Sequence, residues 1–179
     1  MRRVFALLLI SLLAFLSAGC GSEAPDSAKD AVELVYVVDL CFINDEFSGD
    51  EDGPEPAMRY YQNQHIYAVE GKQYFTLLDE VLRENPFGSD SLGTMITEKI
   101  QFNSVVVRDG TAFVDLKGEN LSGSSFEEGL LISQIVITLM GSFSEVERVQ
   151  FLVDGEITES LMGHYDATEP FEDGIYSIK

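Results

Sequence analysis

The sequence is poor in the residues that most often build reactive or metal-holding sites. It has no tryptophan, two histidines and two cysteines among 179 residues. A zinc site usually takes several His or Cys ligands, which this chain cannot easily supply. The histidines, His65 and His164, lie 164 − 65 = 99 positions apart and outside any metal-binding motif, so we interpret both as structural or surface residues. The lack of tryptophan weakens a carbohydrate-binding interpretation without excluding it.

Positive charge is also scarce. The chain holds 11 Lys and Arg against 31 Asp and Glu, a formal net charge of −20. This excess disfavours nucleic acid and anionic headgroups as partners, because like charges repel. The loop at 87–97 lacks the basic residue of a phosphate-binding loop, no Gly-x-Ser-x-Gly run occurs, and with so many acids no carboxylate pair is singled out. We therefore predict neither an enzyme nor a cofactor.

The first twenty residues predict that the protein is exported from the cytoplasm. Two arginines precede an apolar run at 4–15, which is typical of a secretory signal and short for a membrane span. The next residues resemble the lipobox of bacterial lipoproteins, whose cysteine is alkylated with diacylglycerol and becomes the N-terminus after cleavage. We thus predict a signal peptide at 1–19 and a lipid anchor on Cys20. The lipobox residues are Leu16, Ser17, Ala18, Gly19 and Cys20.

Lipidation on Cys20 would make the membrane a partner of the mature protein, on the extracytoplasmic side. Each buried methylene adds about 0.8 kcal/mol, and two or more acyl chains anchor stably where one does not. Cleavage removes two arginines and no acids, so the mature charge is 9 − 31 = −22. In a host with two membranes, Gly21 after the lipidated cysteine favours the outer membrane, since Asp there would favour inner-membrane retention.

Cys41 is the one cysteine that remains after lipidation, so an intramolecular disulfide cannot form. We interpret it as a small apolar side chain at the end of a strand, with intermolecular pairing or metal binding as the alternatives.

The mature chain has the length of one domain. Residues 20–31 hold the lipidated cysteine and a small, polar tether, and residues 32–179 follow as a single domain able to bury about 70% of its unfolded surface. An acidic loop at 44–56 interrupts it. Carboxylates so clustered are weak calcium candidates, because their spacing does not match an EF-hand loop. The candidates are Asp50, Glu51 and Asp52.

Periodicity predicts strands and helices along this domain. The nearly continuous apolar run at 32–42 indicates a central strand covered on both faces. A second strand is predicted at 65–69, and an amphipathic helix is predicted at 72–85. Asp109-Gly110 between two β-branched runs predicts a hairpin at 105–116. A last strand fits 147–153.

A second helix is predicted from Ser124 or Ser125, either of which completes a capping box, to about Met140, with Gly141 as its stop. Its apolar residues occupy nearly the whole circumference. Such a helix is either enclosed by its own domain or shows an apolar flank to a partner. The flank would consist of Leu131, Ile132, Ile135 and Leu139.

These segments together resemble the GerMN domain of bacterial sporulation and spore-germination lipoproteins. The resemblance rests on the helix at 74–82 with Asn85-Pro86, the run 104–116, the helix at 130–139, the run 146–155 and the tail 162–166. It implies an α+β, two-layer fold in which two helices pack on a small, mostly antiparallel or mixed sheet, similar to ring-building motifs. It also implies a non-catalytic assembly role at membranes, and no catalytic residues.

The favoured hypothesis is a lipid-anchored interaction module that helps to assemble envelope, sporulation or germination complexes, with a protein partner in the envelope. The alternative is a lipoprotein that binds a small ligand, calcium or the cell wall.

Overall fold

The computed structural model describes residues 32–47, 56–88 and 91–176. The chain divides into two units, Met1–Asp30 and Ala31–Lys179, and every described residue belongs to the second. The elements in chain order are β1 (Glu33–Asn44), β2 (Met58–Val69), α1 (Gln73–Thr76), the π-helical turn η1 (Leu77–Val81), β3 (Leu92–Gly93), β4 (Phe102–Arg108), β5 (Thr111–Leu116), α2 (Ser125–Ser142), β6 (Arg148–Val153) and β7 (Glu156–Ile157).

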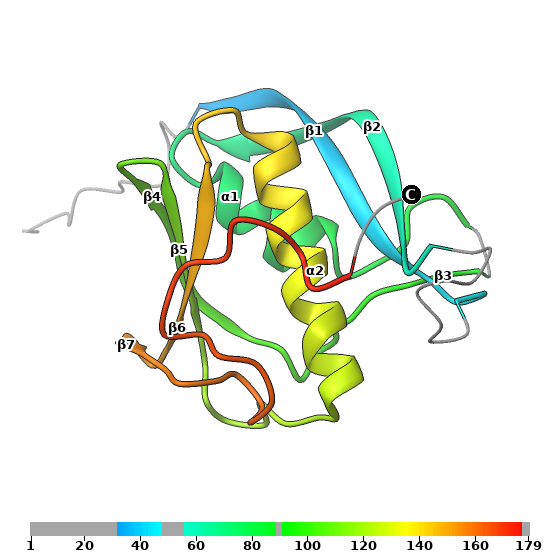
Figure 1. Ribbon diagram of the computed structural model, residues 1–179. Coiled ribbons are helices and arrows are strands. Elements are labelled where there is room, and N and C mark those ends of the chain that lie inside the picture. Colours follow the sequence, from blue (N-terminus) through cyan, green and yellow to red (C-terminus); the bar gives the residue numbers. More distant parts are fainter. Residues whose placement is uncertain (1–31, 48–55, 89–90, 177–179) are drawn as a thin grey trace, which may run out of the picture. The chain divides into compact units, whose positions relative to one another are not determined.

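The strands form two sheets, one with the order β2-β1-β3 and one with the order β4-β5-β6-β7. Among the described strands, β5 and β6 alone pair in parallel, and α2 is the crossover between them. Figure 1 shows α2 between the four-stranded sheet and β1, with α1 on the other side of the core. The predicted α+β class with two helices is confirmed, while the single sheet expected from the sequence is divided in two.

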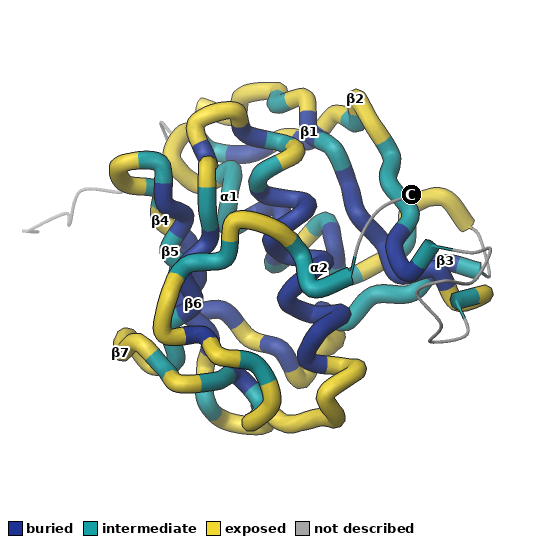
Figure 2. Tube along the Cα trace, in the orientation of Figure 1, coloured by how far each residue is buried: buried dark blue, intermediate teal, exposed yellow. Residues whose placement is uncertain are grey.

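One apolar core joins both sheets to the helices. Most of its buried members come from β1, η1, β4, β5, β6 and α2, and β2 and β3 add Ile66 and Leu92. Figure 2 shows this interior along α2 and the inner faces of the strands. A smaller cluster, including Cys41 and Leu130, lies where α2 meets the end of β1. α2 therefore has apolar neighbours on two flanks.

Two turns form as their sequences predict. Asp109 and Gly110 have φ of 49° and 76° and close the hairpin of β4 and β5. Asp154 and Gly155, with φ of 52° and 86°, close the turn from β6 to β7. Glycine and aspartate tolerate this left-handed region, so the local sequence selects the turn.

The first helix is shorter than predicted. Regular α-helix is confined to Gln73–Thr76 and continues as the π-helical turn Leu77–Val81. In an ideal amphipathic helix over 72–85, Thr76 would fall on the polar face, but it is buried. The wider π-helical turn that begins at Leu77 rotates the residues after it, so an ideal 100° step does not hold along the whole segment.

Gly141 does not end α2, which continues to Ser142. A Cβ at position 141 would overlap the hydroxyl of Tyr60. The glycine thus permits close approach of β2 and provides no C-terminal stop.

The start of β1 is more exposed than its apolar sequence predicts. Val35 and Val37 are each 54% exposed. Their face lies opposite Tyr67 and His65 of β2, which are also exposed. Only the second half of β1 is covered on both faces, because α2 reaches that half alone.

Candidate functional site

A polar strip on α2 completes the open edge of β1. Gln134, Thr138 and Ser142 recur every four residues and so lie along one line of the helix. The Cys41 amide donates to Thr138 Oγ1 at 3.3 Å, and Ser142 Oγ accepts from the Asp39 amide at 3.0 Å and donates to its carbonyl at 2.9 Å. These side chains take the place of a neighbouring strand, since buried backbone groups need partners.

Gln134 joins three segments within this strip. Its Nε2 donates to the Cys41 carbonyl at 3.1 Å, and its Oε1 accepts from the Met95 amide at 2.9 Å. The side chain is fully buried. It therefore fixes the loop before β4 against β1.

Asp39 marks a β-bulge between β1 and β2. The register shifts beside it, and Asn63 on the bulged strand has φ of 56°. The Asp39 carboxylate accepts from the Tyr60 hydroxyl at 2.9 Å and from the Asn63 amide at 2.8 Å. Burial, and then the hydrogen bond to Asp39, raise the pKa of Tyr60 above its usual value. One carboxylate thus ties the bulge to both strands.

The proposed apolar interface on α2 is not available at the surface. All four of its residues are 0% exposed, because α2 is enclosed by β1, the four-stranded sheet and the C-terminal tail. Enclosure, the first of the two outcomes weighed from the sequence, is the one observed. The residues concerned are Leu131, Ile132, Ile135 and Leu139.

Glu128, in the first turns of α2, is a fully buried carboxylate that holds the tail. Its Oε1 accepts from Ser160 Oγ at 2.8 Å and from the amides of Leu161 and Met162 at 3.0 and 2.9 Å. Its Oε2 accepts from the His164 amide at 2.9 Å. Four donors converge on one charge, which is how a carboxylate can be buried without a cation.

The capping box at the start of α2 uses Ser124. Its hydroxyl accepts from the Glu127 amide, and the Glu127 carboxylate accepts from the Ser124 amide at 2.8 Å. These bonds to Ser124 lower the pKa of Glu127, and nearby Lys99 adds to the effect.

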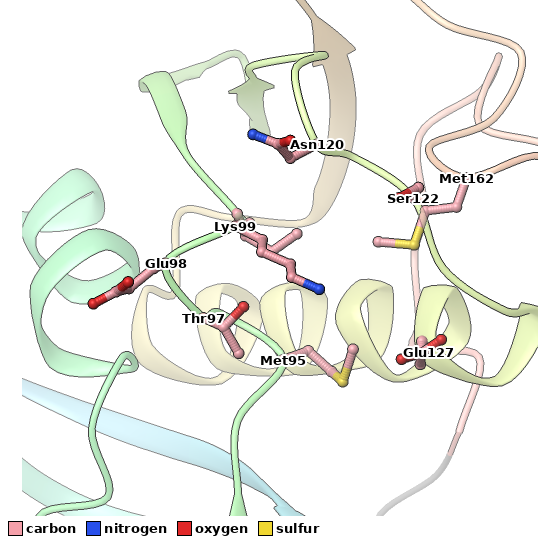
Figure 3. Close-up of a pocket in the computed structure, with 9 residues that line it drawn as sticks. Met95, Thr97, Glu98, Lys99, Asn120, Ser122, Glu127 and Met162 are labelled. Atoms are coloured by element: carbon pink, nitrogen blue, oxygen red, sulfur yellow. The ribbon is translucent and has the colours of Figure 1, made fainter.

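A cavity of about 490 Å³ lies beside this capped helix end. In Figure 3 the Lys99 side chain extends through its middle, Glu127 and the two thioethers lie on one side, and Glu98 points away. Its lining residues are Met95, Thr97, Glu98, Lys99, Ile100, Asn120, Ser122, Glu127 and Met162.

The lining of this cavity offers complementary contacts to a small molecule. Its one cation, Lys99, can meet a carboxylate, Glu127 can meet an ammonium group, and Met95 and Met162 offer soft apolar contacts. Such a lining suits a small amphipathic molecule that carries both charges.

The remaining residues singled out from the sequence have no common site. Cys41 is fully buried, and burial raises its thiol pKa to about 12, which fits the predicted apolar role. His65 and His164 are exposed. Leu16, Ser17, Ala18, Gly19 and Cys20, and the calcium candidates Asp50, Glu51 and Asp52, lie outside the described residues.

The described residues contain neither a cluster of metal ligands nor a membrane-spanning helix. Within residues 32–47, 56–88 and 91–176, no group of three His, Cys, Asp or Glu side chains is placed to hold a metal ion. In the same ranges, no helix has the length and apolar character needed to cross a bilayer.

Sequence reasoning missed Glu128 and Ser142. Ser142 follows Gln134 and Thr138 at the same spacing, so the four-residue repeat could have revealed it. Glu128 carries no such signal, because a glutamate in the first turns of a helix usually faces water.

The family profile described as "Germane: Sporulation and spore germination" matches residues 39–159. This chain belongs to the Germane family. The match spans both sheets and α2, and it contains Asp39, Glu128 and the polar strip. No curated protein is significantly similar to the chain.

Solved structures share the Germane fold at low sequence identity. A candidate lipoprotein from Clostridium perfringens is 22% identical, with a TM-score of 0.50 over 76% of this chain and 88% of that one. The tandem GerMN domains of the sporulation protein GerM from Bacillus subtilis are 15% identical, with a TM-score of 0.53 over 79% of this chain and 46% of that one. The first GerMN domain alone is 14% identical, with a TM-score of 0.50 over 78% and 96%.

Proposed function

We propose that this Germane protein is a lipoprotein anchored through Cys20 on the extracytoplasmic side of a membrane, where it acts as a non-catalytic assembly module of envelope, sporulation or germination complexes. The observation that carries the proposal is the lipobox at 16–20 directly before a short tether and a Germane domain. Residues 1–19 are the signal peptide, 20–31 the anchor and tether, and 32–179 the working domain.

The arrangement of polar groups supports a structural role. Glu128 is engaged by four donors from the tail, while Gln134 and Thr138 are bonded to β1. These buried groups hold segments together, and a domain fixed in this way presents a rigid surface to a partner at little cost in ordering.

The tether keeps the domain near its membrane. Residues 21–31 can span at most about 3.5 Å each, and the mature charge of 9 − 31 = −22 keeps the domain soluble and repelled by anionic headgroups. The start of the domain therefore lies at most about 40 Å from the bilayer surface.

Labelling with an alkyne fatty acid tests the anchor. The wild type should incorporate the label and partition into detergent, and Cys20→Ala should do neither. The matched control is Cys41→Ala, which removes the other cysteine and should keep the label. Label retained by Cys20→Ala would refute the anchor.

Crosslinking in intact cells tests the assembly role. The full chain with an affinity tag should capture the same few envelope proteins in repeated preparations, and Cys20→Ala should lose them while the domain stays folded. If wild type and Cys20→Ala captured the same proteins in equal amounts, the anchored assembly role would be wrong.

Ligand binding is a second candidate function, favoured by the cavity beside Lys99 and Glu127. A wall-derived peptide with free amino and carboxyl groups should raise the melting temperature of the wild type and not of Lys99→Ala. Calcium belongs in the same screen, with Asp50→Asn/Asp52→Asn as its variant. No rise with either ligand would argue against this alternative.

A further inference from the structure

The outer face of β4, β5 and β6 carries a row of two arginines. Arg108 pairs with Thr111, and Thr111 pairs in turn with Arg148, so the three residues lie side by side across the strands. Neighbouring strands are about 4.8 Å apart, which places the two arginine Cα atoms about 10 Å from each other. In Figure 1 α2 covers the opposite face of this sheet, and no described helix lies on the outer one.

Among the described residues, these are the two arginines without an ion pair. Of the four arginines in the described ranges, Arg59 pairs with Glu46 and Arg83 with Asp79. Neither Arg108 nor Arg148 has a carboxylate partner in those ranges, although acids outnumber bases 31 to 11 in the chain.

The Arg148 side chain is held in place across the sheet. Its Nε donates to Thr111 Oγ1 at 2.8 Å, and Thr111 is buried. The two terminal nitrogens of the guanidinium remain for another acceptor. Asp115, the acid on the same face of β5, accepts from the Gly155 amide at 2.9 Å and does not line the groove. Asp109, in the turn between β4 and β5, does line it, so the lining carries two arginines and one acid.

An apolar floor lies next to the arginine row. On the same face, the next cross-strand pair after Arg108 and Thr111 is Val106 with Phe113. Leu152 of β6 also lines this floor. Val106 is 38% exposed, and Phe113 and Leu152 are half-buried. Together they line a groove of about 350 Å³, enough for a few side chains.

We propose that this groove docks an acidic segment of a partner protein, with a carboxylate against Arg108 and Arg148 and an adjacent apolar side chain on Val106 and Phe113. The guanidinium fork fits a carboxylate through two parallel hydrogen bonds. This docking groove would be the surface through which the protein carries out its proposed assembly role, so the inference rests on that proposed function.

The floor distinguishes a protein segment from other anions. A polyphosphate has no apolar group to place on Val106 and Phe113, and an anionic bilayer would meet the repulsion of a domain with many more acids than bases. A segment in which acidic and apolar residues alternate can contact both the arginine row and the apolar floor of the groove. β4 is also an edge strand of its sheet, so an extended segment can lie beside it.

Fluorescence anisotropy with the full chain in non-ionic detergent tests the proposal. The probe is a fluorescein-labelled nonapeptide in which glutamate alternates with valine and phenylalanine, and a second peptide has glutamine in place of glutamate. Inorganic polyphosphate and phosphatidylglycerol vesicles are the competing anions.

The matched variants are Arg108→Gln/Arg148→Gln and Lys72→Gln/Lys117→Gln. Both remove two positive charges from exposed or half-buried positions, but the lysines lie away from the groove. The arginine double variant should bind the glutamate peptide about tenfold or more weakly, and the lysine double variant within about twofold of wild type. Val106→Ser should weaken peptide binding and leave polyphosphate binding unchanged.

Three results would overturn the proposal: equal weakening in both double variants, equal binding of the glutamine peptide, or tighter binding of polyphosphate or vesicles than of the glutamate peptide. The absence of any peptide binding by the wild type would overturn it too. Lipid labelling of Cys20 and cellular crosslinking are measured separately, so failure here is distinguishable from failure of the assembly role.

Discussion

Replacement of Gln134 by leucine tests whether the polar strip of α2 holds the domain together. The change keeps a buried side chain of similar size but removes the acceptor of the Met95 amide and the donor to the Cys41 carbonyl. Each buried polar group left without a partner costs about 1–3 kcal/mol. We therefore expect Gln134→Leu to lower the free energy of unfolding by about 2–4 kcal/mol, a large part of a typical total of about 5–15 kcal/mol.

Urea unfolding followed by circular dichroism measures this loss. Thr138→Val removes only the acceptor of the Cys41 amide, whose bond is 3.3 Å long, so it should cost about 1 kcal/mol and less than Gln134→Leu. Ser125→Ala is the control on the same helix, because Ser125 is exposed, and it should stay within about 0.5 kcal/mol of wild type. A Gln134→Leu protein as stable as Ser125→Ala would show that the strip does not support β1.

Three further changes probe the contacts around α2, each by urea unfolding. Glu128→Gln gives the tail's donors one acceptor oxygen fewer and should cost about 2–3 kcal/mol; a neutral result would contradict the buried-carboxylate account. Ser124→Ala should cost about 1 kcal/mol at neutral pH. Because the folded state lowers the pKa of Glu127, its contribution is present above the ordinary glutamate pKa and is lost as pH falls through the lowered value, so the cost should shrink in acid. Gly141→Ala should destabilise despite the better helix propensity of alanine, and less so in a Tyr60→Phe background, where the overlapping hydroxyl is gone; equal effects in both backgrounds would contradict the overlap.

Local sequence was enough to predict elements whose cause is local. Asp109-Gly110 specifies the hairpin because few other residues accept its φ values of 49° and 76°. A capping box likewise predicts the start of α2 to within one residue, at Ser124 or Ser125, and the structure uses Ser124. Where the chain leaves ideal geometry, prediction failed: the π-helical turn at 77–81 and the bulge at Asn63 both change which side chains face the core.

Features that depend on distant partners could not be read from the sequence. An apolar helix is compatible with enclosure or with a partner surface, and only the positions of β1 and the tail show that α2 is enclosed. Arg108 and Arg148 are 148 − 108 = 40 positions apart in the sequence, and they lie on either side of Thr111 because β4 and β6 both pair with β5. Each looks like an ordinary surface charge until that pairing is known.

The enclosure of α2 determines where a partner can bind. The polar strip of α2 contacts β1, its apolar flanks lie in two core clusters, and its first turns are covered by the tail. The sheets are therefore the main surfaces on which a partner can bind. Most of the domain repels an acidic partner, since its acids outnumber its bases. The arginine row attracts the same partner, so repulsion elsewhere and attraction there favour one orientation of approach. An acidic domain with a pair of arginines on one sheet face can thus select a partner by where that partner is allowed to touch.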